Sequence, residues 1–182
     1  MVKRQTIRGL LLATRPKTLP AGICPVLLGT ALARDAGRLH LLSALACLVG
    51  AVFIQIGTNY ANDYFDFVKG TDSADRLGPT RATQAGWVTP RQMLTAFIAA
   101  FAVAGVAAVY LSQRGGWGFL LLLGISIVCG ILYTAGPLPL GYIGLGDVFA
   151  FTFFGPVAAA ATHYVQTLTF DWNAVLAGCA PG

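Results

Sequence analysis

Glutamate is absent from this sequence of 182 residues, and charged residues of every kind make up only 10% of it. So little charge, together with 56% hydrophobic residues and a mean hydropathy of +0.70, argues against a soluble domain and indicates a polytopic membrane protein. Because there is no glutamate, all seven acidic residues are aspartates, and four of them fall within residues 63–75. Any chemistry that needs carboxylates therefore depends on aspartate.

Paired cysteines are also missing. The four cysteines stand singly inside apolar runs, without a CxxC pattern or a neighbouring histidine, which argues against a zinc site or a disulfide framework. The formal net charge of +5 would suit a protein that binds nucleic acid. However, Lys and Arg lie in short segments that flank the apolar runs, as topology signals do, so we expect no nucleic-acid partner.

Five apolar runs are long enough to cross, or nearly cross, a hydrocarbon core that needs about 20 helical residues. We expect helices at residues 18–33, 41–62, 91–113, 117–135 and 148–168, and the start of a sixth at 173–182. Thr89 and Pro90 predict an N-cap and a first helical residue for the third run. The expected fold is an all-α, polytopic transmembrane bundle. Because the sixth run stops early, we expect the domain to continue beyond it.

The basic residues orient these helices in the membrane. If the N-terminus is cytoplasmic, nine of the twelve Lys and Arg residues lie on the cytoplasmic side, as the positive-inside rule requires. The polar connections at residues 67–90 and 136–147 then share that side. We therefore expect both connections to contribute to one site.

Polar side chains interrupt the end of the second apolar run at helical spacing. Asn59, Asn62, Asp63 and Asp66 form one stripe on a helix, and Gln55 extends it one turn back. An aspartate at the centre of a bilayer helix costs about 2.5–3.5 kcal/mol, so a buried stripe needs a compensating partner. Carboxylate and amide oxygens are ligands that Mg²⁺ prefers. We predict a Mg²⁺ site on Asp63 and Asp66, with Asn62 or Asn59 as the amide ligand; the alternative is a solvated helix end.

A Mg²⁺ ion next to a basic loop is a means of binding a diphosphate. Mg²⁺ usually takes one or two carboxylates together with phosphate oxygens and waters. Arg76 and Arg81, with Lys17 across the bundle, would neutralise the remaining phosphate charge. A hydrocarbon tail would lie between the apolar helices. The favoured substrate is a polyprenyl diphosphate, whose allylic C–O bond ionises once the charge of the leaving group is stabilised.

The motif Asn62-Asp63-x-x-Asp66-x-x-x-Gly70-x-Asp72 resembles the first aspartate-rich motif, NDxxDxxxD, of the UbiA-type intramembrane aromatic prenyltransferases. Gly70 stands where that motif has its third aspartate, so Asp72 is the candidate to replace it. Longer stretches are similar to the branch that prenylates 1,4-dihydroxy-2-naphthoate in menaquinone synthesis; they cover residues 15–20, 59–72, 78–86 and 133–147.

The resemblance implies a bundle of about nine helices in a bacterial inner membrane, with a cavity for the tail that opens laterally to lipid. It also implies Mg²⁺-dependent loss of diphosphate, attack of the naphthoate ring carbon on the allylic cation, and loss of CO₂ to give demethylmenaquinone. Residues 1–182 would then be the N-terminal part of one prenyltransferase domain. The second aspartate-rich motif of the family would fall beyond residue 182, so we expect this chain alone to be inactive.

The resemblance also extends the set of candidate site residues. Asp63, Asp66 and Arg81 are the candidates for catalysis, and the candidates for substrate binding are Arg15, Lys17, Asn59, Asn62, Asp72, Arg76, Tyr133 and Asp147. Simpler roles remain open for several of them: topology for the basic residues, an interfacial aromatic for Tyr133, and a helix N-cap for Asp147. Two functional alternatives also remain, namely prenyl transfer to another acceptor such as 4-hydroxybenzoate, and cation-coupled transport.

Overall fold

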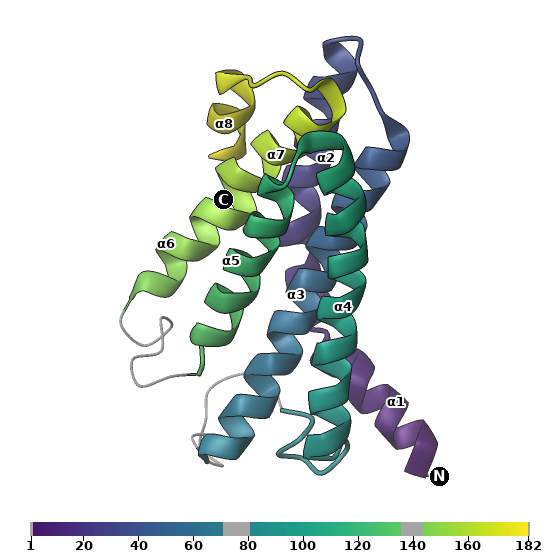
Figure 1. Ribbon diagram of the computed structural model, residues 1–182. Helices are drawn as coiled ribbons and strands as arrows, with labels where there is room; N and C mark the ends of the chain where they lie inside the picture. Colours follow the sequence, from purple (N-terminus) through teal and green to yellow (C-terminus); the bar gives the residue numbers. More distant parts are fainter. Residues whose placement is uncertain (1, 71–80, 136–143, 182) are drawn as a thin grey trace.

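The computed structural model describes residues 2–70, 81–135 and 144–181, and this part of the chain contains helices and no strand (Figure 1). The expectation of an all-α bundle is confirmed. The α-helices are α1 (Val2–Ala13), α2 (Leu19–Asp35), α3 (Leu41–Lys69), α4 (Pro90–Gly115), α5 (Gly118–Leu132), α6 (Leu145–Thr152), α7 (Ala158–Thr167) and α8 (Trp172–Gly178). A 3₁₀ turn, η1 (Pro16–Thr18), precedes α2, and a π-helical turn, η2 (Phe153–Val157), joins α6 to α7.

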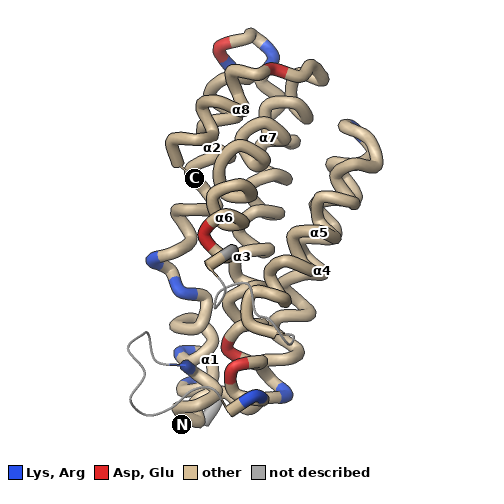
Figure 2. The backbone as a smooth tube through the Cα atoms, turned by 90° about the vertical axis from the view of Figure 1, so that its left-hand side faces the viewer, with Lys and Arg blue, Asp and Glu red and all other residues tan. Residues whose placement is uncertain are grey.

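Within the part of the chain that the structure describes, three helical stretches are long and apolar enough to span a membrane: α3, α4 and the continuous stretch Gly146–Thr167. The apolar α5 is shorter. Most charged residues lie toward the two ends of the bundle, and long parts of α3, α4 and α5 between them carry none (Figure 2). This distribution is that of a multi-pass membrane protein.

The helix α3 continues beyond the apolar run 41–62 and beyond Asp66, the last residue of the expected stripe, and ends at Lys69. Gly70 ends it by adopting a left-handed conformation with φ 64°, and its N–H donates to the carbonyls of Asp66 and Phe67. A change from apolar to polar side chains alters the surroundings of a helix but does not end it. The whole polar stripe therefore lies on one helix.

The fifth apolar run forms one helical stretch, Gly146–Thr167, close to the expected 148–168, but it is distorted in the middle. Pro156 has no N–H to donate, and Gly155 has φ −122° and ψ −106°, outside helical values. The result is the π-helical turn η2 between α6 and α7. At Thr89 and Pro90 the prediction is confirmed: the Thr89 hydroxyl accepts from the Gln92 N–H, and the Gln92 side chain accepts from the Thr89 N–H.

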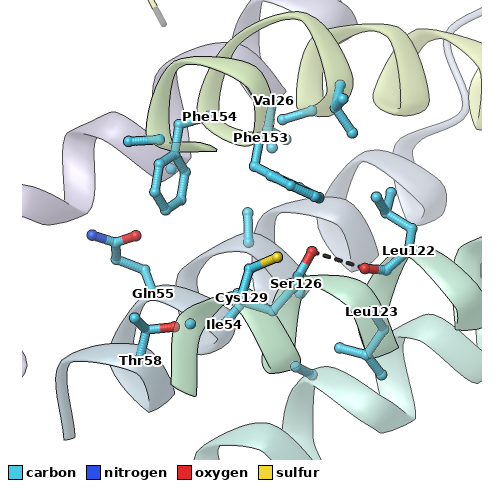
Figure 3. Close-up of a pocket in the computed structure, with 18 of the residues that line it drawn as sticks. Val26, Ile54, Gln55, Thr58, Leu122, Leu123, Ser126, Cys129, Phe153 and Phe154 are labelled. Atoms are coloured by element: carbon cyan, nitrogen blue, oxygen red, sulfur yellow. Dashed lines mark hydrogen bonds between the residues drawn. The ribbon is translucent and has the colours of Figure 1, made fainter. Parts of the chain in front are cut away.

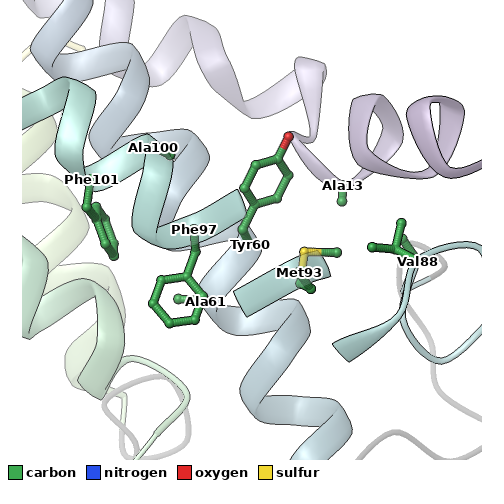
Figure 4. Packing of buried hydrophobic residues seen from close by; sticks show 9 residues of the cluster. Ala13, Tyr60, Ala61, Val88, Met93, Phe97, Ala100 and Phe101 are labelled. Carbon is green, nitrogen blue, oxygen red and sulfur yellow. The ribbon is translucent and has the colours of Figure 1, made fainter. Parts of the chain in front are cut away.

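A buried cluster holds α1 and the segment before α4 against α3 (Figure 4). Met93 and Phe97 of α4 lie in this cluster with Tyr60 of α3 and Ala13 of α1. Val88, in the segment before α4, also belongs to it. Met93 is fully buried, and Val88 is 1% exposed. The cluster places the chain that follows residue 80 beside the polar end of α3.

At the opposite end, two arginines that we expected to act only as topology signals bind the C-terminus of α7. Arg114 donates from Nε to the Val165 carbonyl at 2.8 Å and from Nη2 to the Gln166 carbonyl at 3.2 Å. Arg38 donates to the Thr167 carbonyl at 3.1 Å. Cations at this end also interact favourably with the helix dipole. These bonds tie α7 to the turn that follows α2 and to the last turn of α4.

Candidate active site

The predicted polar stripe lies on one face of α3 and is buried throughout its length. The exposed fractions are 8% for Gln55, 5% for Asn59 and Asn62, 2% for Asp63 and 1% for Asp66. The two aspartates are thus not on a solvated helix end. The side chains of the stripe contact three neighbouring segments, namely the chain after residue 80, the end of α5 and the turn between α1 and α2, and these contacts define the site.

The Asp63 carboxylate holds the chain that follows residue 80. Its Oδ2 accepts from the Ala82 N–H at 2.8 Å, and its Oδ1 accepts from the Thr83 N–H at 3.1 Å. Hydrogen bonds to a carboxylate stabilise its charged form. Each oxygen still has a lone pair, because a carboxylate offers about four acceptor positions. Asp63 is therefore compensated in this structure by main-chain donors.

Asp66 forms a buried ion pair with Arg81, whose side chain is 7% exposed. The sequence argument required a partner for this carboxylate and proposed a cation, and Arg81 supplies a positive charge. The guanidinium carries five N–H donors, so it can hold Asp66 and contact a second anion.

Asn62 connects α3 to the end of α5. Its Oδ1 accepts from the Thr134 hydroxyl at 2.7 Å, and the Lys69 ammonium donates to the Thr134 carbonyl at 2.8 Å. The predicted amide ligand thus has one of its acceptor positions taken by Thr134. Together these bonds bring the ends of α3 and α5 to one side of the bundle, where we expected the two polar connections to meet.

Asn59 and Gln55 hold the short connection between α1 and α2, residues 14–18. Asn59 donates to the Thr14 carbonyl at 2.9 Å, and both amides donate to the Thr18 hydroxyl at 3.4 Å. Between these anchors Arg15 adopts a left-handed conformation with φ 51°. Such a backbone is unfavourable for a residue with a side chain and persists where its surroundings enforce it. The stripe therefore fixes Arg15 in place.

A cavity of about 330 Å³ lies beside the stripe, and Figure 3 shows part of its lining. Its walls come from α2, α3, α4, α5 and the α6–α7 stretch and are mostly apolar, with the rings of Phe153 and Phe154 directed into the cavity. Polar residues concentrate toward one end, where Asn59, Asn62 and Arg15 line it. The cavity can hold a hydrocarbon chain with a polar group at that end.

The other predicted site residues do not belong to the polar stripe. Tyr133 lines the cavity and is 40% exposed. Lys17 is exposed in η1. Asp72 and Arg76 lie outside the described residues. Asp147 is exposed in the first turn of α6; the N-cap interpretation was wrong, because Gly144 occupies that position and makes no side-chain cap.

Several residues at the site were missed by the sequence argument. The N–H donors of Ala82 and Thr83 carry no sequence signal, because every residue except proline has one. Thr134 follows the candidate Tyr133 in the sequence. However, a single threonine among apolar residues does not indicate which residue its hydroxyl will bond to.

The carboxylates at this end suit a hard divalent cation. Among the described residues, no group of three or more His, Cys, Asp or Glu side chains could hold a metal. Asp63 and Asp66 remain as a pair of oxygen ligands, and Mg²⁺ typically uses one or two carboxylates and completes its shell with waters and phosphate oxygens. The residues present therefore fit Mg²⁺ bound together with a diphosphate.

Comparison with known proteins decides the family. The model of the UbiA prenyltransferase family matches residues 22–182. The chain belongs to this family. The match includes α3 with its entire stripe and the helices that line the cavity.

The UbiA-family chain also resembles individual curated proteins. It is 40% identical over 168 residues to the 1,4-dihydroxy-2-naphthoate octaprenyltransferase of Mycobacterium tuberculosis, covering 92% of this chain and 57% of that protein. Proteins of the same name match in Escherichia coli, with 41% identity over 92% of this chain and 56% of the relative, and in Bacillus subtilis, with 35% over 90% and 52%. The chain spans a little more than half the length of these relatives.

Proposed function

We propose that the full-length protein transfers a polyprenyl group from polyprenyl diphosphate to 1,4-dihydroxy-2-naphthoate in a bacterial inner membrane. The products are diphosphate, CO₂ and the quinol form of demethylmenaquinone. The names of the relatives support this acceptor. The observation that carries the proposal is the buried Asp63–Asp66 pair on α3, directly after Asn62, which lines the polar part of an otherwise apolar cavity.

The two parts of the donor substrate match the two parts of the site. A diphosphate at the polar end would lie near Arg81 and Arg15, whose guanidinium groups suit phosphate oxygens. The polyprenyl tail would follow the apolar walls between α3 and the α6–α7 stretch.

Asp63 and Asp66 would hold Mg²⁺, with Asn59 as a neighbouring amide. When bound, Mg²⁺ neutralises charge that develops on the leaving diphosphate. Arg81 would add to this effect while its bond to Asp66 keeps the guanidinium in position. The main-chain bonds from Ala82 and Thr83 would orient Asp63 before the substrate binds.

The chemistry needs only charge stabilisation and positioning. The allylic C–O bond breaks, and its electron pair leaves with the diphosphate. The ring carbon that carries the carboxylate attacks the allylic carbon, and the C–CO₂ bond then breaks so that its electrons restore the aromatic ring. No oxidant or reductant is required. Apolar walls that exclude water would protect the cation from hydrolysis.

The test uses membranes that contain the full-length protein. They receive a polyprenyl diphosphate with either 1,4-dihydroxy-2-naphthoate or 4-hydroxybenzoate, with and without Mg²⁺. We expect Mg²⁺-dependent diphosphate release with the naphthoate, and its loss in Asp63→Asn and Asp66→Asn. Asp35→Asn is the matched control, because Asp35 is exposed at the far end of α2.

Each alternative result has a distinct meaning. Turnover with 4-hydroxybenzoate alone would keep the mechanism and change the acceptor. Turnover without Mg²⁺ and without any other divalent ion would refute the metal assignment. No prenyl transfer to either acceptor, together with cation flux in sealed vesicles, would replace the enzyme with a transporter.

A further inference from the structure

One polar atom inside the cavity has no role in the contacts described above. The Oε1 of Gln55 has no hydrogen-bond partner among the described residues, and the side chain is 8% exposed. Figure 3 shows this carboxamide at the edge of the cavity, with the ring of Phe154 across from it. A buried amide oxygen without a donor is unfavourable, so a donor is expected from something that enters the cavity.

The hydrogen bonds around Thr18 determine which way the Gln55 amide faces. The Thr18 hydroxyl donates its one proton to the Arg15 carbonyl at 3.0 Å. Toward Gln55 it can therefore only accept, and the bond at 3.4 Å must come from Nε2. With the nitrogen directed at Thr18, the oxygen faces the cavity.

The substrates of the proposed reaction differ in what they can donate. A polyprenyl chain has no hydrogen-bond donor, and an ionised diphosphate accepts only. The aromatic acceptor carries hydroxyl groups, which are donors. Gln55 lies seven residues before Asn62 on α3, about 10 Å away at a rise of 1.5 Å per residue, on the apolar side of the diphosphate end. A ring bound between these two positions would lie next to the allylic carbon.

We propose that the Oε1 of Gln55 accepts a hydrogen bond from a ring hydroxyl of the aromatic acceptor and thereby selects hydroxylated acceptors. This inference rests on the proposed function and assigns Gln55 a role in acceptor specificity that is separate from metal and diphosphate binding. A site whose hydrogen-bond-accepting atom faces a substrate hydroxyl discriminates against analogues that lack this hydroxyl, because the accepting atom is then left unpaired.

The main test compares wild type with Gln55→Met, which keeps the side-chain length and removes the amide. We expect KM for the dihydroxy acceptor to rise about tenfold, as loss of one hydrogen bond implies, with KM for polyprenyl diphosphate unchanged. We also expect wild type to prefer the dihydroxy acceptor over its mono-O-methyl ethers, and Gln55→Met to lose the preference against one of the two ethers. Gln113→Met is the matched control, because Gln113 is exposed near the end of α4.

Thermal unfolding in detergent separates this role from a structural one. Gln55→Met removes the unpaired oxygen, which is unfavourable in the empty cavity, and also the long bond from Nε2 to Thr18 at 3.4 Å. Because these two effects oppose each other, we expect the Tm of Gln55→Met without substrate to lie close to that of wild type. Adding the dihydroxy acceptor should raise the Tm of wild type more than that of the variant. Gln55→Glu, which keeps acceptor oxygens, should retain more of this shift than Gln55→Met.

The outcomes distinguish the inference from the proposed function. If wild type turns over and Gln55→Met keeps its acceptor KM and its ether selectivity, the inference is wrong and the function stands. A clearly lower Tm for the variant without substrate would show a structural role instead. If wild type transfers no prenyl group to any aromatic acceptor, the proposed function fails and the inference fails with it.

Discussion

Asp66 and Arg81 form an ion pair between two side chains that are almost completely buried, 1% and 7% exposed. The pair joins the last turn but one of α3 to the chain that follows residue 80. A buried ion pair adds little to stability when it is compared with apolar side chains of similar volume. Removing only one partner, however, leaves an uncompensated buried charge. The site therefore depends on both residues being present.

A first prediction concerns this pair. We expect Arg81→Met to destabilise the protein by about 3–5 kcal/mol, because it strands the Asp66 carboxylate. The double variant Asp66→Asn/Arg81→Met should lose less than the sum of the two single variants, with a coupling of about 1–3 kcal/mol. Unfolding of the purified protein in mixed micelles measures this. Additive losses would show that the two residues act independently.

A second prediction concerns Asp63. In Asp63→Asn only one side-chain oxygen remains, so the N–H of Ala82 or of Thr83 loses its acceptor. We expect a loss of about 1–3 kcal/mol in stability. Limited proteolysis should detect faster cleavage between α3 and α4. Asp171→Asn is a control, since an asparagine at that N-cap of α8 can still accept from the Asn173 N–H.

A third prediction concerns the link between α3 and α5. Thr134→Val removes the hydroxyl that donates to Asn62, whereas Thr134→Ser keeps it. We expect Thr134→Val to lower stability by about 0.5–1.5 kcal/mol and to reduce kcat, with Thr134→Ser close to wild type. Thr95→Val is the matched control, because the Thr95 hydroxyl is exposed and bonds only to the Arg91 carbonyl of its own helix. Equal activity in both Thr134 variants would remove Thr134 from the site.

A fourth prediction concerns the contact of α2 with α7. A Cβ on Gly29 would overlap the Ala159 carbonyl, so the two helices approach closely only because residue 29 has no side chain. We expect Gly29→Ala to cost about 1–3 kcal/mol through overpacking. Gly105→Ala, in the middle of α4 with nothing nearby, should instead be neutral or stabilising by up to about 1 kcal/mol. If both substitutions have the same effect, helix propensity and not packing controls the response.

The sequence predicted the parts of the site that depend on spacing along one helix. The positions of Asn59, Asn62, Asp63 and Asp66 place them on one face whatever the tertiary structure, and the structure confirms that face. Contacts between segments could not be predicted in this way. The main-chain donors after residue 80 leave no trace in the sequence, and an amide such as Asn62 does not reveal which of its atoms faces its partner.

Two details of the fold have local causes that hydropathy alone did not predict. The end of α3 is set by the left-handed Gly70, and the fifth run, although it stays one helical stretch, is distorted at Gly155 and Pro156. All three residues were visible in the sequence, but membrane helices also tolerate glycine and proline, so their presence did not settle the outcome. The helix α1 was not expected, because a short basic segment gives little signal.

The bond between Asp63 and the chain after residue 80 has a consequence for how such proteins diverge. The carboxylate contacts peptide groups and not side chains, so many replacements at positions 82 and 83 leave the bonds intact. Proline at either position would remove a donor, and a large residue at 82 would not fit, since Ala82 is 1% exposed. Relatives can therefore share this anchoring while their residues at these positions differ, and a comparison of residue identities would overlook it.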